Sequence, residues 1–345
     1  MKSKPKSESR RILIFNVNWL GDVLFSTATI RNIRYHFPGS FIACIIPSRC
    51  YPVLKGNPYL DEIIIYDEED RHKNLTEKWR FVRLLKNKNF DMAFLLHRSF
   101  TRTLLCFLAG IPERIGYSTK KRNFLLTEKF PAPRIQDTHR IDYYLGLIQA
   151  WGIKVEDRFS DFFTSDADLE FADDFLKKNA LKRNDFLVAI NPGGNWLLKR
   201  WPKENWVTLA DKLVGELGAR VIITGSEHDI PLAKEMQSLM HHKASLACGA
   251  LNLKQFGALC RRLSLFITAD SGPLHIANSV GTRKIIALFG PTHPVITGPY
   301  PQKKVVILHK NIGCLIPCYK LDCPDNRCMR ALTVEEVFTT ARKIL

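Results

Sequence analysis

The amino-acid sequence predicts an α/β protein built from two doubly wound, Rossmann-like domains. Short apolar runs alternate with helix-like segments along most of the chain, which is the pattern of parallel β-sheets covered by helices. The alternation lapses in a polar segment between Gly152 and Asp168, which we interpret as the interdomain connection, and then begins again. A chain of 345 residues with 46% hydrophobic residues is long enough for two separate cores.

The first predicted domain spans residues 11–160. Gly39 and Pro47 mark turns that flank its second apolar run. The predicted strands are Ile12–Val17, Phe41–Ile46, Glu62–Tyr66 and Met92–Leu96, and the predicted helices are Asp22–Tyr35, Leu75–Lys86 and Thr138–Trp151.

The second predicted domain spans residues 168–330 and is followed by a C-terminal helix over 333–345. Pro202 in the first turn and Gly218 after the last turn delimit its first helix. Thr333 and Glu336 have the spacing of a capping box at the start of the C-terminal helix. The predicted strands are Phe186–Ile190, Arg220–Thr224, Leu263–Thr268 and Lys284–Phe289, and the predicted helices are Pro202–Leu217, Glu235–His241, Pro273–Val280 and Val334–Leu345.

The charge balance indicates an anionic partner. Lys and Arg number 51 against 34 Asp and Glu, a net charge of +17, which suits a nucleic acid, an acidic membrane surface or a phosphorylated substrate. The basic residues are spread along the chain without a zinc-finger spacing or an RNA-binding aromatic signature, so we do not expect nucleic acid. The first apolar run is too short for a signal peptide or a membrane span, which predicts a cytoplasmic protein.

The most informative segment, Thr268–Ala277, is a strand-to-helix turn with the sequence Asp270-Ser271-Gly272. Such a turn directs unpaired backbone N–H groups and the positive end of a helix dipole at one point, where a phosphate binds well. We expect Ser271 to cap the helix and Gly272 to allow close approach of a ligand. The alternative is a capping turn with no ligand.

A second loop of the same domain also suits a phosphate. A predicted strand ends in Asn191-Pro192-Gly193-Gly194, and Lys199 and Arg200 follow shortly before a helix. Flexible glycine amides can approach a diphosphate that Lys199 neutralises. Alternatively, the two basic residues form only a solvated helix entry. No G-x-G-x-x-G sequence follows a strand, which argues against an ordinary dinucleotide-binding domain.

An acidic residue lies at a strand end of the first domain. The first strand leads into Gly21 and Asp22, and Asp22 is placed at or near the start of the next helix. Two doubly wound domains that face each other leave a cleft at the carboxyl ends of both sheets. We expect Asp22 to point into that cleft, where it could act as a general base towards a hydroxyl nucleophile. The alternative is an N-cap or first-turn acid that stabilises the helix dipole.

These segments resemble glycosyltransferase family 9, the ADP-heptose:lipopolysaccharide heptosyltransferases. The resemblance runs from about Arg11 to the C-terminus, and its motifs have the order and spacing of the family. They are Asn18-Trp19-Leu20-Gly21-Asp22-Val23, Asn191-Pro192-Gly193-Gly194 with Lys199-Arg200-Trp201-Pro202, and Asp270-Ser271-Gly272-Pro273-Leu274-His275-Ile276-Ala277 with Phe289-Gly290-Pro291-Thr292. The terminal segment with Cys314, Pro317, Cys318, Cys323, Cys328 and Met329 resembles the heptosyltransferase II branch.

The resemblance implies a GT-B fold, with two domains facing across a cleft, and an inverting glycosyl transfer without metal or cofactor. The implied donor is ADP-L-glycero-β-D-manno-heptose. The implied acceptor is the phosphorylated inner core of lipopolysaccharide, lipid A-Kdo already carrying one heptose. The enzyme would then be cytoplasmic, with a peripheral location at the inner face of the inner membrane.

The resemblance also implies roles for single residues. Asp22 takes the role of general base, Lys199 steadies the donor phosphates, and Asn18 and Trp19 contact the acceptor. Either Glu227 or Asp229 meets the ribose hydroxyls. Family members often have His or Thr where this chain has Asn191, Gly193 and Gly194, so phosphate contacts there would be main-chain. The remaining implied donor-site residues are Arg200, Asp270, Ser271, Gly272 and His275.

Four thiols fall within 15 residues near the C-terminus, in the pattern C-x3-C-x4-C-x4-C. Structural zinc, reduced thiols packed in a loop, and a disulfide formed under oxidation are three alternatives for Cys314, Cys318, Cys323 and Cys328. The scattered Cys44, Cys106, Cys248 and Cys260 are expected to be buried small hydrophobes.

Two other functions remain open at this point. A GT-B sugar-nucleotide epimerase would need further acids and a histidine converging on the sugar. A non-catalytic nucleotide or nucleic-acid binding module would need no base, so an Asp22→Asn variant would retain its function.

Overall fold

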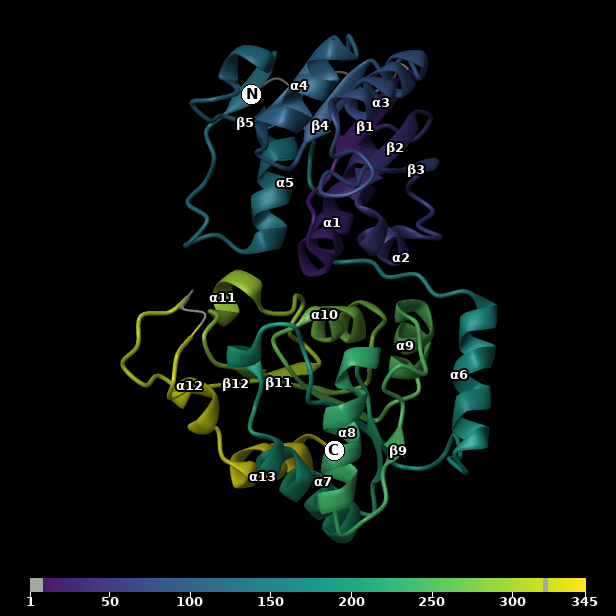
Figure 1. Cartoon of the computed structure of the whole chain (residues 1–345), viewed down its shortest axis with the longest axis vertical. Coiled ribbons are helices and arrows are strands. Elements are labelled where there is room, and N and C mark those ends of the chain that lie inside the picture. The colour runs from purple at the N-terminus through teal and green to yellow at the C-terminus, as the bar shows by residue number, and fades with distance from the viewer. Residues whose placement is uncertain (1–8, 319–321) are drawn as a thin grey trace. The chain divides into compact units, whose positions relative to one another are not determined.

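The computed structural model describes residues 9–318 and 322–345, and the chain forms two compact units, Met1–Phe163 and Thr164–Leu345 (Figure 1). Each unit contains a six-stranded parallel sheet flanked by helices. The predicted α/β class with two doubly wound domains is therefore confirmed. No helix in the described parts of the chain is long and apolar enough to cross a membrane.

The sheet of unit 1 has the strand order β3-β2-β1-β4-β5-β6. The order reverses between β1 and β4, and ligands of doubly wound sheets bind beyond the carboxyl ends of the strands at such a point. The strands are β1 (Arg11–Phe15), β2 (Phe41–Ile46), β3 (Glu62–Ile65), β4 (Met92–Leu95), β5 (Glu113–Tyr117) and β6 (Glu128–Phe130). The helices are α1 (Leu20–His36), α2 (Tyr51–Leu54), α3 (Leu75–Asn87), α4 (Phe100–Leu108) and α5 (Arg140–Trp151).

The strands β5 and β6 and the helix α4 were not predicted. Charged residues begin β5 and obscure its strand pattern, but both charges are paired in the fold. Glu113 lies 3.2 Å from the guanidinium of Arg10, and Arg114 donates to the carbonyl of Leu125 at 2.6 Å. Polar partners that are distant in sequence therefore permit a strand that hydrophobic periodicity alone does not reveal.

The segment predicted as the interdomain connection is packed mainly on unit 1. Arg31 of α1, which is 3% exposed, donates to a carboxylate oxygen of Asp157 at 2.9 Å and to the carbonyl of Phe159 at 2.7 Å. It also forms an ion pair with Asp161. The division between the units falls after Phe163, and α6 (Asp166–Lys178) begins shortly afterwards. The predicted connection over 152–168 was thus too long, because a buried arginine holds most of it on α1.

The sheet of unit 2 has the order β12-β11-β10-β7-β8-β9, which reverses between β7 and β10. Its strands are β7 (Leu187–Asn191), β8 (Arg220–Ile223), β9 (Ser245–Leu246), β10 (Leu265–Ala269), β11 (Ile285–Phe289) and β12 (Val305–His309). Besides α6, its helices are α7 (Lys203–Leu217), α8 (Ile230–Leu239), α9 (Leu253–Cys260), α10 (Gly272–Ser279), α11 (Pro294–Thr297), α12 (Arg327–Arg330) and α13 (Val334–Ile344).

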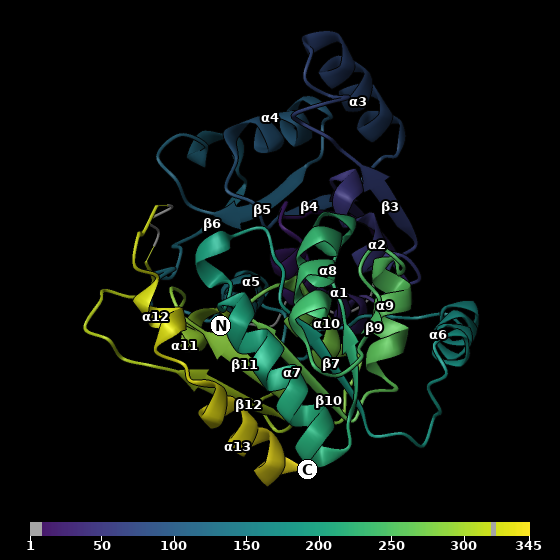
Figure 2. The same ribbon diagram turned by 60° about the horizontal axis from the view of Figure 1, so that its bottom comes forward.

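The helix ends of unit 2 follow the sequence signals in most places. Gly218 ends α7 with φ of 64°, and the predicted capping box of Thr333 and Glu336 opens α13. Pro202 occupies the N-cap position of α7 rather than its first turn. The helix expected at 235–241 begins earlier, as α8. The C-terminal helix α13 packs against α7 within unit 2 (Figure 2).

The core of unit 2 lies on both faces of its sheet. The residues of β7, β10 and β11 are all buried, as expected for central parallel strands covered on both sides. Trp206 of α7 is fully buried and packs edge-to-face on Trp201, with ring centroids 5.1 Å apart. This rigid centre supports the loops that leave the carboxyl ends of the strands.

Candidate functional site

Parallel pairing brings the two predicted phosphate loops of unit 2 to the same edge of its sheet. Asn191 at the end of β7 is in register with Thr268 near the end of β10. The loop after β7 and the Asp270-Ser271-Gly272 turn therefore leave adjacent strands. The Asn191 side chain is buried and accepts a hydrogen bond from Thr224 after β8 at 3.1 Å, which ties a third strand end to the same edge.

Asp270 is a buried carboxylate that holds Lys199. One of its oxygens accepts hydrogen bonds from Lys199 Nζ at 2.7 Å and from Thr292 Oγ1 at 2.6 Å, and the other lies 3.5 Å from His275 Nε2. Burial raises the pKa of Asp270, but the hydrogen bond to His275 and the charge of Lys199 outweigh burial and hold that pKa well below its ordinary value. Asp270 therefore remains ionised and fixes the Lys199 ammonium at the sheet edge.

This lowered pKa predicts a loss of stability in acid. An unfolded aspartate titrates near 3.8, above the pKa of folded Asp270, so its stabilising contribution is complete at higher pH and is lost as the pH falls from 3.8 towards the folded pKa. We expect the wild-type protein to lose about 1 kcal/mol more unfolding free energy than Asp270→Asn between pH 5 and pH 3. Urea unfolding at both pH values measures the difference. Equal losses in the two proteins would contradict the assignment.

Lys199 and Arg200 are both engaged in unit 2 rather than extended into solvent. The Lys199 ammonium lies 5.2 Å from the centre of the Trp196 ring. Arg200 donates through Nε to the carbonyl of Gly194 at 2.9 Å and lies 3.5 Å from a carboxylate oxygen of Asp229. The alternative of a merely solvated helix entry is therefore wrong for both residues.

The two acids considered for the ribose have different surroundings. Asp229 is buried and accepts hydrogen bonds from the backbone N–H and hydroxyl of Ser226, at 2.9 and 2.7 Å. A Cβ added to Gly193 would lie 2.2 Å from an oxygen of Asp229, so only glycine permits this approach. Asp229 thus shapes the loop after β7, whereas Glu227 is exposed and can reach a ligand.

Ser271 occupies the N-cap position of α10, but its side chain makes no capping hydrogen bond. Its hydroxyl is buried and has no hydrogen-bond partner among residues 9–318 and 322–345. The capping prediction for Ser271 is therefore wrong. The start of α10, at Gly272, retains donors that a side-chain cap would have used.

In unit 1, Asp22 lies in the first turn of α1, and Trp19 is the N-cap residue. One carboxylate oxygen of Asp22 accepts a hydrogen bond from the Tyr144 hydroxyl of α5 at 2.8 Å. Burial, and secondly the charge of Asp22, raise the pKa of Tyr144 well above its ordinary value, so the phenol remains a donor. The Asp22 side chain is half-buried and held in place, as a general base requires.

The two residues assigned to the acceptor lie on the loop between β1 and α1. Trp19 is 70% exposed, and the guanidinium of Arg49 lies 5.3 Å from its ring centre. Asn18 accepts a hydrogen bond through its backbone carbonyl from Arg49 at 3.3 Å. Its side-chain oxygen is buried and has no hydrogen-bond partner within the described chain, so of the two residues Trp19 presents the exposed surface.

Sequence reasoning missed a group of arginines in unit 1. Arg122 is fully buried, yet its guanidinium donates only to carbonyl and hydroxyl oxygens, including the carbonyls of His97 at 2.6 Å and Tyr117 at 2.7 Å. Within the described ranges it forms no ion pair. Burial, and secondly nearby arginines, lower the pKa of His97 to about 4, so this imidazole is neutral at pH 7.

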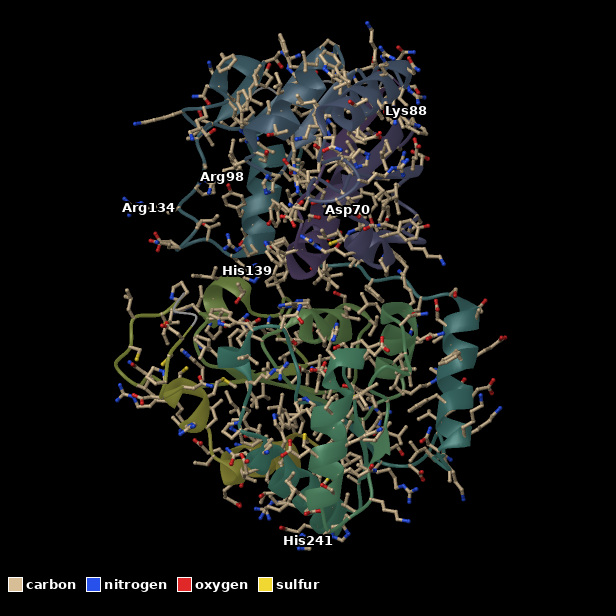
Figure 3. The ribbon with its side chains drawn as sticks, in the orientation of Figure 1. Asp70, Lys88, Arg98, Arg134, His139 and His241 are labelled. Atoms are coloured by element: carbon tan, nitrogen blue, oxygen red, sulfur yellow. The ribbon has the colours of Figure 1, made fainter. Side chains whose placement is uncertain are left out.

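The charges of three arginines act on the hydroxyl of Tyr143 on α5. Tyr143 is 3% exposed, and its hydroxyl has no hydrogen-bond partner in the described parts of the chain. Burial raises its pKa, and the charges of Arg98, Arg122 and Arg140 act against that rise. Neither Arg98 nor Arg140 forms an ion pair with a described residue. Figure 3 labels Arg98, which follows His97 in the loop between β4 and α4.

The neighbouring Tyr144 of α5 links Tyr143 to Asp22. The Tyr143 ring packs on that of Tyr144, with centroids 5.6 Å apart, and Tyr144 binds Asp22. The signal available in the sequence was the position of His97-Arg98 immediately after a predicted strand, the same signal that singled out Asp22. It was overlooked because basic residues are spread along the whole chain.

All nine cysteines are free thiols in the structure, so no disulfide joins the C-terminal four. Cys44, Cys106 and Cys260 are buried as predicted, and Cys248 is half-buried. Within the described ranges, the structure contains no group of three or more His, Cys, Asp or Glu side chains arranged to hold a metal ion.

Comparisons with known proteins extend over both units. A family model described as glycosyltransferase family 9 (heptosyltransferase) matches residues 78–327. Lipopolysaccharide heptosyltransferase 2 of Salmonella typhimurium is 27% identical over 321 residues, which cover 86% of this chain and 87% of that protein. Lipopolysaccharide heptosyltransferase 2 of Escherichia coli K12 is 26% identical over 306 residues, with coverages of 86% and 87%.

Solved structures show the same fold. A glycosyl transferase family 9 protein from Veillonella parvula has a TM-score of 0.89 at 24% identity, and 99% of each chain is covered. The E. coli ADP-heptose lipopolysaccharide heptosyltransferase II has a TM-score of 0.78 at 22% identity, with coverages of 97% and 98%.

Proposed function

Because the chain belongs to glycosyltransferase family 9, the heptosyltransferases, we propose that it transfers heptose from ADP-L-glycero-β-D-manno-heptose to the inner core of lipopolysaccharide. Its two Rossmann-like units are those of the GT-B fold. The observation that carries the proposal is the Lys199–Asp270 pair at the carboxyl edge of the unit 2 sheet, next in sequence to the start of α10. A fixed ammonium and a helix N-terminus together suit a nucleoside diphosphate.

The proposed reaction is a single displacement with inversion. Asp22 accepts the proton of the acceptor hydroxyl as its oxygen attacks the anomeric carbon of the heptose. The bond from that carbon to the diphosphate oxygen breaks, and ADP leaves with the electron pair. Lys199 and the amides at the start of α10 stabilise the negative charge that develops on the leaving diphosphate.

Contacts to the rest of the donor are assigned from the exposure of each residue and from which of its polar atoms are not already hydrogen-bonded. Glu227 is exposed and accepts hydrogen bonds from the ribose hydroxyls, while Asp229 maintains the loop. Asn191 and the glycines at 193 and 194 contribute main-chain groups, because the Asn191 side-chain oxygen is already bonded to Thr224. Arg200 acts through that loop, since its Nε is bonded to the carbonyl of Gly194.

The choice of sugar nucleotide tests this proposal directly. ADP-heptose, UDP-sugars and GDP-sugars are added separately, and the shift in thermal unfolding is measured for each. The proposal expects the largest shift with ADP-heptose. A larger shift with a UDP-sugar, together with interconversion of that sugar, would replace it by an epimerase; tight ADP-heptose binding without transfer to any acceptor would leave a binding module.

Two arginines of unit 1 support an anionic acceptor. Arg98 and Arg140 have no ion-pair partner among the described residues, and their charges act on Tyr143, whose neighbour Tyr144 binds Asp22. A phosphate or carboxylate of the inner core would complement them. The same charge, with the net +17 of the chain, suits peripheral attachment to the anionic inner face of the inner membrane.

Removing these arginines should weaken acceptor binding selectively. We expect Arg98→Ala and Arg140→Ala each to raise the acceptor KM about fivefold, because each loses a charge-assisted contact worth roughly 1 kcal/mol. ADP affinity should stay unchanged. Arg134→Ala provides a matched control, since Arg134, like Arg98, is exposed in unit 1 and labelled in Figure 3. Equal KM effects of all three variants would indicate unspecific loss of charge.

Activity should survive EDTA. The proposal assigns stabilisation of the leaving group to Lys199 and α10, and no D-x-D motif lies at a strand end in the C-terminal half, where a donor-bound metal would sit. Initial rates are measured after exposure to EDTA and after Mg²⁺ or Mn²⁺ is added back. Immediate loss of rate with full recovery on re-addition would contradict the metal-independent mechanism.

A further inference from the structure

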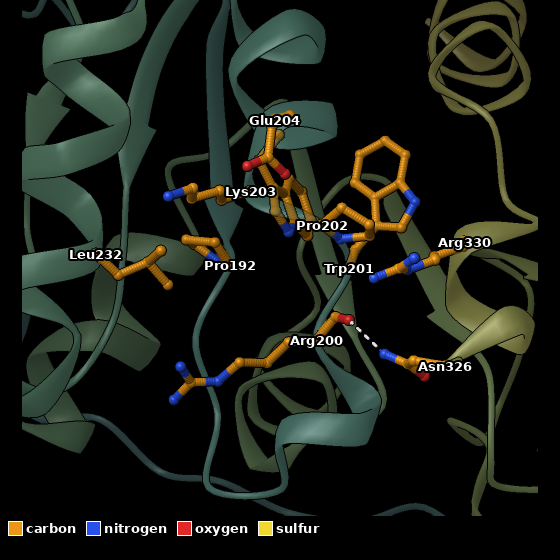
Figure 4. A pocket seen from close by; sticks show the side chains of 10 residues that line it. Pro192, Arg200, Trp201, Pro202, Lys203, Glu204, Leu232, Asn326 and Arg330 are labelled. Carbon is orange, nitrogen blue, oxygen red and sulfur yellow. Dashed lines mark hydrogen bonds between the residues drawn. The ribbon is translucent and has the colours of Figure 1, made fainter. Parts of the chain in front are cut away.

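A cavity of about 300 Å³ lies in unit 2 beside the loop that follows β7 (Figure 4). Pro192 and Arg200 of that loop line it, together with the start of α7, Leu232 of α8, and the segment with Asn326 and Arg330 at α12. Neither Lys199 nor Asp270 lines this cavity. It is therefore separate from the groups assigned to the leaving diphosphate.

One buried hydrogen-bond donor of the cavity lining has no partner. Trp206 lines the cavity and is fully buried, and its Nε1 has no hydrogen-bond partner in the described parts of the chain. Arg330 is exposed at the cavity, and its guanidinium forms no hydrogen bond or ion pair with any residue in ranges 9–318 and 322–345. An indole N–H and a guanidinium can only donate, so an occupant that satisfies them must present acceptor atoms.

The charge of the lining favours an anion. Arg200, Lys203 and Arg330 carry positive charge, and Glu204 is the one acid among the lining residues. Lys203 is paired with Glu235, and Arg200 lies 3.5 Å from a carboxylate oxygen of Asp229. Of these three cations, only Arg330 forms no ion pair with a described residue. Apolar surface completes the wall, contributed by Pro192, Trp201, Pro202 and Leu232.

We propose that this cavity binds a small oxyanion, a carboxylate or phosphate group carried by a molecule of few atoms, and that its binding changes the affinity of the neighbouring loop for the donor nucleotide. The cavity and the loop share Arg200. Its backbone carbonyl accepts a hydrogen bond from Asn326 at 3.4 Å, and its Nε donates to Gly194 at 2.9 Å. The identification of the coupled ligand as ADP or ADP-heptose rests on the proposed function. The binding of the oxyanion to the cavity does not.

The test measures binding without turnover. Inorganic phosphate, glycerol 3-phosphate and acetate are titrated separately into the protein in saturating ADP, which occupies the donor site, and tryptophan fluorescence is recorded. We expect a saturable response to the phosphates or to acetate, and the tighter ligand identifies the class. Arg330→Gln should weaken that ligand about tenfold. Arg327→Gln, on the same short helix but outside the lining, should leave binding unchanged.

Three results would overturn the proposal: no saturable response to any of the probes, equal affinity in wild type and Arg330→Gln, or loss of the response in Lys199→Ala. The last would show that phosphate is bound at the donor site. Trp206→Phe, which keeps a ring in the core, should also weaken binding. If Trp206→Phe fails to fold, Arg330→Gln still tests the site independently.

Coupling is reciprocal, so a saturating concentration of the oxyanion should change ADP affinity by the same factor by which ADP changes oxyanion affinity. Unchanged ADP affinity would contradict the coupling.

Discussion

Turnover of Asp22→Asn should fall by about two orders of magnitude or more, while ADP affinity and stability remain near those of the wild type. The amide is nearly the same size as the carboxylate, and its oxygen can still accept the hydrogen bond from Tyr144. It cannot accept the proton of the acceptor hydroxyl. Single-turnover rates with saturating donor and acceptor, together with calorimetric ADP titration, separate the loss of chemistry from any loss of binding.

Asp70→Asn is the matched control for Asp22→Asn, because Asp70 is an exposed acid of the same unit, labelled in Figure 3. Its turnover should equal that of the wild type. Near-normal turnover in Asp22→Asn would rule out Asp22 as the base and would assign proton removal from the acceptor to another group.

Lys199→Ala should weaken binding of ADP and of the donor together by about thirtyfold, or roughly 2 kcal/mol, because the diphosphate is common to both ligands. The same substitution should also lower the stability of the protein. Loss of the ammonium removes one of the partners that keep buried Asp270 ionised, so the free energy of unfolding should decrease as well. Calorimetry measures the affinity, and urea unfolding measures the stability.

Lys212→Ala separates these effects from a general loss of positive charge. Lys212 is a basic residue of the same unit, but it forms surface ion pairs with Glu216 and Glu335 on α7 and α13. ADP affinity should be unaffected by that substitution. Unchanged ADP affinity in Lys199→Ala would mean that the proposed donor site is misplaced.

The positions of the site residues could be predicted because they follow strands. Hydrophobic periodicity located β1, β7 and β10, and parallel pairing then placed the residues after β7 and β10 on one sheet edge. The same reasoning placed Asp22 after β1. Strands such as β5, whose charged side chains find ion-pair or hydrogen-bond partners elsewhere in the fold, could not be found in this way, because periodicity does not report tertiary partners.

The roles of several residues depended on side-chain contacts that the sequence does not contain. Glu227 and Asp229 are two residues apart and equally acidic, yet only Asp229 turns inward to bind Ser226. Ser271 stands where a cap belongs but makes no capping bond. The arginines around Tyr143 come from three separate segments, so only the folded chain brings them together.

The contact between Gly193 and Asp229 restricts how the specificity of the donor loop can be changed. Any side chain at 193 would collide with the carboxylate, so this position cannot supply a new group for a different nucleotide. Removing the carboxylate to make room would also leave the Ser226 hydroxyl without its acceptor and Arg200 without its ion-pair partner. Attempts to engineer donor choice should therefore begin at the exposed Asn195, where a larger or charged residue can be introduced without altering the packing of the loop.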